Sequence, residues 1–79
     1  MTDKAVFITF SDGYYKFLLD DGEILIFEEI NPFVLKKFDL KKDKTLEGKT
    51  FLITYSDVYD DVEDDYFYNK IENLIIVTE

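Results

Sequence analysis

The segment from Gly22 to Leu40 constrains the fold of this 79-residue chain more than any other part. It reads GEILIFEEINPFVLKKFDL, and it leads from a glycine turn through an apolar strand into a short helix. Two strand-like segments come before it in the chain, and two come after it. The predicted order of elements is therefore three strands, one helix and two strands.

Residues 24–27, ILIF, are apolar without interruption, which predicts a strand that is covered on both faces. The helix start is marked by Asn31, whose side chain can accept hydrogen bonds from first-turn amides, and by Pro32, which has no amide to satisfy. One face of this helix is apolar and carries Val34, Leu35 and Phe38. A helix this short depends on packing that face against the rest of the molecule.

Four other segments alternate as strands do: residues 4–10, 14–19, 49–57 and 66–77. Short turns join the first three strands, at Ser11-Asp12-Gly13 and at Asp20-Asp21-Gly22. The last strand has two readings, one through Ile75 and one that slips at Asn73 onto Leu74, and a bulge there would explain both. The predicted core comprises Val6, Ile8, Phe10, Phe17, Phe27, Leu35, Phe38, Phe51, Ile53 and Ile71.

The element order matches the five-stranded Greek-key barrel of the OB-fold, with the helix closing one end. An SH3-like barrel or an open α+β sheet fits the order less well, and both stay open as alternatives. Seventy-nine residues have room for one domain, so residues 1–79 are expected to form a single small β-barrel domain.

The composition argues against several classes of protein. The chain has no Cys and no His, which removes disulfides, thiolate chemistry and the commonest zinc ligand. Without these residues the candidate nucleophiles are Ser11, Ser56, Thr or Tyr with a carboxylate or Lys as base, which gives catalysis little support, so we expect no enzyme and no cofactor. No apolar run reaches the ~20 residues of a membrane span, and residues 1–9 lack a signal pattern, so a cytoplasmic protein is expected.

Charge is distributed unevenly along the chain, whose net charge is −9. Residues 36–49 hold six Lys and three acids, a local charge of +3, and the rest holds three Lys and fifteen acids, a charge of −12. The molecule is therefore expected to have one mildly basic end and an acidic remainder.

The densest acidic stretch comprises Asp57, Asp60, Asp61, Glu63, Asp64 and Asp65. Asp61, Glu63 and Asp65 have the alternate spacing of a calcium loop, but Tyr66 stands where such a loop needs glycine. We therefore predict no metal site there. A solvated loop that presents carboxylates to a basic protein is the preferred interpretation.

The leading functional hypothesis is a non-catalytic interaction module that offers acidic loops and exposed aromatics to a basic protein partner and, by extension, imitates nucleic acid. The candidate binding residues are Asp57, Tyr59, Asp60, Asp61, Glu63, Asp64, Asp65, Tyr14, Lys16 and Tyr68. The alternative is a single-stranded nucleic-acid binder that uses Tyr14, Lys16 and the lysines of residues 36–49. Carboxylates near that aromatic face would repel phosphates, which disfavours the alternative. A structural role in a larger assembly is a third hypothesis, and no membrane partner is expected.

Overall fold

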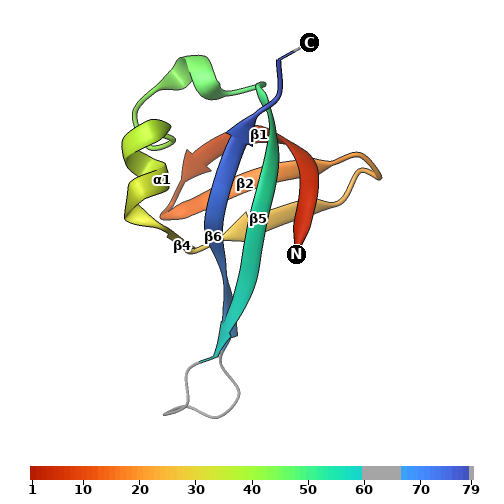
Figure 1. Ribbon diagram of the computed structural model, residues 1–79, viewed down its shortest axis with the longest axis vertical. Coiled ribbons are helices and arrows are strands. Elements are labelled where there is room, and N and C mark those ends of the chain that lie inside the picture. Colours follow the sequence, from red (N-terminus) through yellow and green to blue (C-terminus); the bar gives the residue numbers. More distant parts are fainter. Residues whose placement is uncertain (60–66, 79) are drawn as a thin grey trace.

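The computed structural model describes residues 1–59 and 67–78, with residues 58, 59, 67 and 68 described by their backbone alone. Figure 1 shows the arrangement of the elements along the chain. They are β1 (Thr2–Ser11), β2 (Tyr14–Leu19), β3 (Ile24–Phe27), β4 (Glu29–Ile30), α1 (Pro32–Lys37), the 3-10 helix η1 (Lys44–Leu46), β5 (Thr50–Tyr59) and β6 (Phe67–Ile76).

The strands form one six-stranded mixed sheet in the order β3-β2-β1-β5-β6-β4. Every pairing is antiparallel except that of β4 with β6, which is parallel. The prediction of a mainly β chain with one short α-helix is confirmed. The sheet is not closed, so the predicted five-stranded barrel is not confirmed, and a sixth, two-residue strand (β4) lies between β3 and α1.

The chain segment that contains β3 and β4 meets both ends of the sheet. Glu28 alone separates these two edge strands, and its amide donates a hydrogen bond to the Asn69 carbonyl of β6 (3.2 Å). In the middle of the order, β1 is shared: residues 2–6 pair with β5, while residues 5–11 pair with β2. As a result β5 and β6 cross the other three strands in Figure 1.

The inward face of β1 differs from the prediction. Ala5 and Phe7 are buried, whereas Val6 is half-buried and Ile8 is 37% exposed, so assigning Val6 and Ile8 to the core was wrong. The cause is a bulge, because the register with β2 shifts between Phe7 and Thr9. An extra residue in one strand reverses which side chains face the core beyond it, so Phe10 packs against the core again.

Two other expectations about strand faces have different outcomes. The predicted cover on both faces of β3 is wrong, since Phe27 is fully buried while Ile24 is 53% exposed. The predicted bulge in the last strand is confirmed by a register shift, because Thr54 pairs with Asn73 while Tyr55 pairs with Ile71. Strand β5 also extends beyond the predicted strand 49–57, since it continues through residues 58 and 59.

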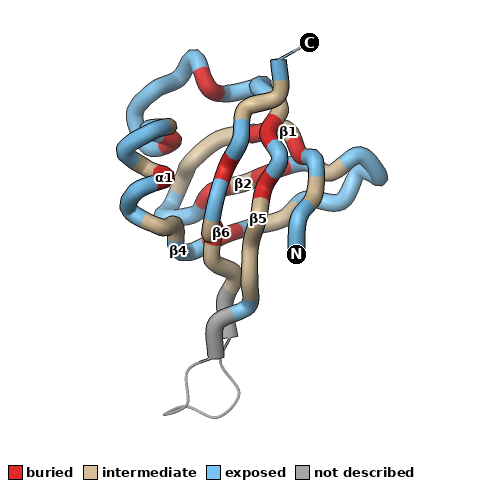
Figure 2. The backbone as a smooth tube through the Cα atoms, in the orientation of Figure 1, coloured by how far each residue is buried: buried red, intermediate tan, exposed pale blue. Residues whose placement is uncertain are grey.

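Aromatic rings fill the core, and Phe17 lies among them. Its ring centre is 5.2 Å from that of Phe7, 5.9 Å from that of Phe27 and 6.3 Å from that of Phe51. Figure 2 shows buried positions alternating with more exposed ones along the strands. Tyr15 is also buried, and burial, followed by the charge of Asp39, raises the pKa of its phenol.

The helix begins as the sequence predicts and is tied to β6. The Asn31 side chain accepts a hydrogen bond from the Phe33 amide (3.0 Å), and Pro32 occupies the first turn. The Asn31 amide donates to the Ile71 carbonyl of β6 (2.8 Å). Of the predicted apolar face, Val34 is buried, and Leu35 and Phe38 pack against the core from partly buried positions. Phe33 is 73% exposed.

Neighbouring positions on β5 test the alternation of its two faces. Phe51 is fully buried and Leu52 is 40% exposed. Replacing Phe51 by Ala should lower the free energy of unfolding by about 3–5 kcal/mol, which is most of the stability of a domain this small. Leu52→Ala is the matched control and should cost far less. Urea denaturation monitored by circular dichroism measures both, and equal losses would contradict the assigned faces.

The hydrogen bond between Tyr55 and Asp3 predicts a loss of stability at alkaline pH. The Tyr55 hydroxyl donates to Asp3 Oδ2 (2.6 Å), and this bond, followed by burial and nearby carboxylates, raises the pKa of Tyr55 from 10.0 to about 12. The unfolded chain therefore releases this proton first as the pH rises, so the stabilisation is full below about pH 10 and falls toward pH 12. Removing the hydroxyl with Tyr55→Phe should remove this part of the pH dependence.

Urea midpoints between about pH 8 and pH 11.5 measure this effect for the wild type and Tyr55→Phe. Tyr14→Phe serves as a control, because Tyr14 is an exposed tyrosine outside this hydrogen bond, and it should follow the wild type. Parallel curves for the wild type and Tyr55→Phe would contradict the role assigned to the Tyr55–Asp3 hydrogen bond.

Candidate functional site

The side of β1, β2 and β3 that faces away from the core carries a row of aliphatic side chains. Leu18 pairs with Ile24 on one side and with Val6 on the other, so the three side chains lie next to one another across three strands. Ile24 is 53% exposed and Leu18 is 38% exposed. We call this surface the outward face; its members are Val6, Ile8, Tyr14, Lys16, Leu18, Ile24 and Ile26.

The remaining members extend this row along the strands. Ile26 is 47% exposed and lies opposite Lys16. Ile8 is brought to the surface by the bulge in β1, and Tyr14 lies at the start of β2 with 38% of its surface exposed. The outward face is thus mainly aliphatic, with one aromatic ring and one ammonium group.

Carboxylates stand at both ends of β2, in the two hairpin turns. Asp12 and Gly13 both have positive φ, the backbone that a two-residue hairpin turn requires. In the second turn, the Asp21 side chain accepts a hydrogen bond from the Glu23 amide (2.9 Å). The exposed acids of these turns are Asp12, Asp20, Asp21 and Glu23. An apolar centre with negatively charged ends therefore characterises this side of the sheet.

The β5–β6 hairpin lies beside the outer edge of β3. The Asn69 side chain of β6 donates a hydrogen bond to the Ile26 carbonyl (3.3 Å), and Asn69 pairs with Asp57 of β5. Asp57 is exposed, and it is the first of the six acids at residues 57–65. The strands that lead into the acidic stretch thus contact the edge of the sheet that carries the outward face.

The structure brings some of the predicted binding residues together. Tyr14 and Lys16 share the outward face. Asp57 lies on β5 opposite Asn69, whose side chain bonds to the Ile26 carbonyl at the edge of that face. Tyr59 and Tyr68 belong to β5 and β6, and their side chains lie outside the described part of the molecule. The other predicted residues lie outside the described residues: Asp60, Asp61, Glu63, Asp64 and Asp65.

Sequence reasoning missed the aliphatic part of the outward face. The apolar run at residues 24–27 predicted a strand covered on both faces, whereas the structure leaves Ile24 and Ile26 exposed. The turn between β2 and β3 sets which side chains face outward. In it the Leu19 amide donates a hydrogen bond to the Glu23 carbonyl (2.8 Å), and Leu18 lies opposite Ile24. Leu18 and Val6 were not predicted as site residues.

Within residues 1–59 and 67–78, no group of acidic side chains is arranged to hold a metal ion. No helix in the same part of the chain has the length and hydropathy needed to cross a membrane. Several of the described acids instead accept structural hydrogen bonds, as Asp3, Asp21 and Asp43 do.

Comparison with protein-family models, with curated proteins and with solved structures found no significant match to this chain.

Proposed function

We propose that this protein is a non-catalytic interaction module that binds a protein partner through the outward face. The row formed by Ile24, Leu18 and Val6 is the observation that carries the proposal. Single exposed aliphatic residues are ordinary on a protein surface, but a contiguous group of them is typical of an interaction site. The partner would cover this row with apolar side chains of its own.

The charges around the outward face indicate which charges the partner should carry around its own apolar centre. Carboxylates flank the apolar centre in both hairpin turns, and the strands beside Ile26 lead into six further acids. A partner with basic side chains around an apolar centre would match this pattern, and the acids would accelerate its association. A protein that ordinarily binds nucleic acid has this chemistry, so the module could occupy such a protein's binding surface.

We also propose that the sheet has the OB-type arrangement. If β3, Glu28 and β4 act as one bent strand, its parallel pairing with β6 joins the two edges of the sheet, and α1 follows at the position typical of that fold. OB-folds bind ligands over their second and third strands. These are the strands that carry most of the outward face.

Nucleic-acid binding is the weaker alternative on this surface. Stacking of bases requires aromatic rings, and phosphates require cations. Tyr14 and Lys16 supply one of each, while the aliphatic neighbours Leu18, Ile24 and Ile26 offer neither. The carboxylates in the adjoining turns would repel the phosphate backbone.

Paired substitutions on the outward face test the proposal. The double variant Ile24→Ser/Ile26→Ser removes two exposed side chains, so the fold should survive. The control is Ile75→Ser, because Ile75 is 53% exposed on β6, as Ile24 is on β3. Partners captured from source-cell lysate are identified with wild-type bait, purified and titrated. Loss of two buried aliphatic contacts should weaken binding at least about 10-fold, and Ile75→Ser should not.

A second set of variants tests the acidic rim. Asp20→Asn/Asp21→Asn/Glu23→Gln keeps the Asp21 acceptor in its turn and removes three charges. It should slow association and flatten its salt dependence, since rim charges act mainly on the association rate. The nucleic-acid alternative predicts the reverse: oligonucleotide binding rises in this variant and falls in Lys16→Gln.

Unchanged protein capture by Ile24→Ser/Ile26→Ser would rule out the outward face as the binding surface.

A further inference from the structure

A groove runs along α1 on a different part of the molecule from the outward face. It has a volume of about 440 Å³ and is lined by Pro32, Leu35, Lys36, Asp39, Lys41 and Lys42. A second hollow of about 390 Å³ continues it toward β4 and shares Pro32, Leu35 and Lys41 with it. The groove therefore combines an apolar floor with three ammonium groups and one carboxylate, that of Asp39.

The lysines around this groove keep their positive charge exposed. Lys36 lies over the Phe33 ring and Lys41 over the Phe10 ring, each 5.7 Å from the ring centre. A contact with an aromatic ring orients an ammonium group without neutralising it. The acids of the same segment have other partners: Asp39 accepts a hydrogen bond from the Lys42 amide (3.3 Å), and Asp43 from the Thr45 amide (3.0 Å).

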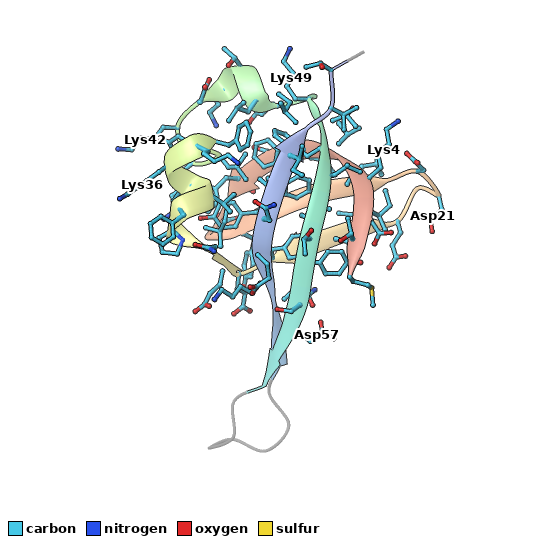
Figure 3. All side chains as sticks on the ribbon, viewed as in Figure 1. Lys4, Asp21, Lys36, Lys42, Lys49 and Asp57 are labelled. Atoms are coloured by element: carbon cyan, nitrogen blue, oxygen red, sulfur yellow. The ribbon has the colours of Figure 1, made fainter. Side chains whose placement is uncertain are left out.

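The ligand chemistry that fits this groove is a peptide that carries carboxylates next to apolar side chains. The chain itself contains one such peptide, residues 57–66, DVYDDVEDDY, with six acids and no Lys. In Figure 3 the labelled Lys36 and Lys42 lie beside α1, whereas Asp57 lies toward the opposite end of the molecule. The basic groove and the start of the acidic segment are therefore at different ends of one protomer.

We infer that the groove along α1 binds the acidic segment 57–66 of a second copy of this chain. The contact is heterologous: each copy offers one groove and one acidic segment, so dimers can extend into longer assemblies. The net charge of −9 opposes association at long range. At 0.15 M salt the Debye length is about 8 Å, much shorter than the 42 Å length of the protomer, so that repulsion is largely screened while the direct contacts persist.

Sedimentation velocity of the full chain at 0.15 M and 1 M salt tests this inference. The groove variant is Lys36→Gln/Lys41→Gln/Lys42→Gln. Its matched control, Lys37→Gln/Lys44→Gln/Lys49→Gln, removes the same charge from the same segment without touching the groove lining. The acid variant is Asp60→Asn/Asp61→Asn/Asp64→Asn/Asp65→Asn, and its matched control is Asp12→Asn/Asp20→Asn/Asp21→Asn/Glu23→Gln.

We expect the wild type and both controls to associate with rising concentration at 0.15 M salt and to return toward the 9.4 kDa monomer at 1 M. The groove variant and the acid variant should each stay monomeric. Mixing these two variants should restore a 1:1 dimer and nothing larger, because only one intact groove and one intact acidic segment remain in each pair.

Three results would overturn the inference: a wild type that stays monomeric up to about 1 mM, equal loss of association in the groove variant and its control, or no dimer in the mixture. The proposed function is tested separately. Ile24→Ser/Ile26→Ser should lose its protein partner and still self-associate, so failure of one idea leaves the other measurable.

Discussion

The packing of Phe17 against three other phenylalanine rings is the interaction on which the rest of this structure depends. Phe7, Phe27 and Phe51 come from β1, β3 and β5, so contact with one ring sets the inward register of three other strands at once. A domain of 79 residues buries a small fraction of its surface compared with larger ones, and aromatic rings supply the largest buried area per residue. The fold therefore depends on a few rings rather than on many aliphatic contacts.

That register also determines what is left outside. Once Phe17 and Phe27 point inward, their neighbours Leu18 and Ile26 must point outward, because side chains alternate along a strand. α1 is tied to β6 through Asn31 and Ile71. Leu18 and Ile26 thus stay on the surface, where they form part of the proposed binding site, so the position of this proposed site follows from the packing of the core.

Charge is separated on the same small scaffold. Two acids of residues 36–49, Asp39 and Asp43, accept local hydrogen bonds within the connection between α1 and β5. The ammonium groups of Lys36 and Lys41 lie over rings beside an apolar groove. One chain thus has an acid-flanked apolar face and a basic groove, and the two proposals assign a separate partner to each.

Features that depend on neighbouring residues could be predicted from the sequence. The helix start at Asn31-Pro32, the tight turn at Asp12-Gly13 and the inward Phe51 follow from local hydrogen bonding, backbone freedom and alternation. The bulge in β1, the exposure of Ile24 and the path of the sheet edges could be seen only in the folded molecule. The bulge in β1 comes at the end of an apolar run, residues 5–8, which reads the same with either face inward, and the run ILIF reads the same whether another layer covers it or not. These features are fixed by contacts between distant segments, which no local pattern contains.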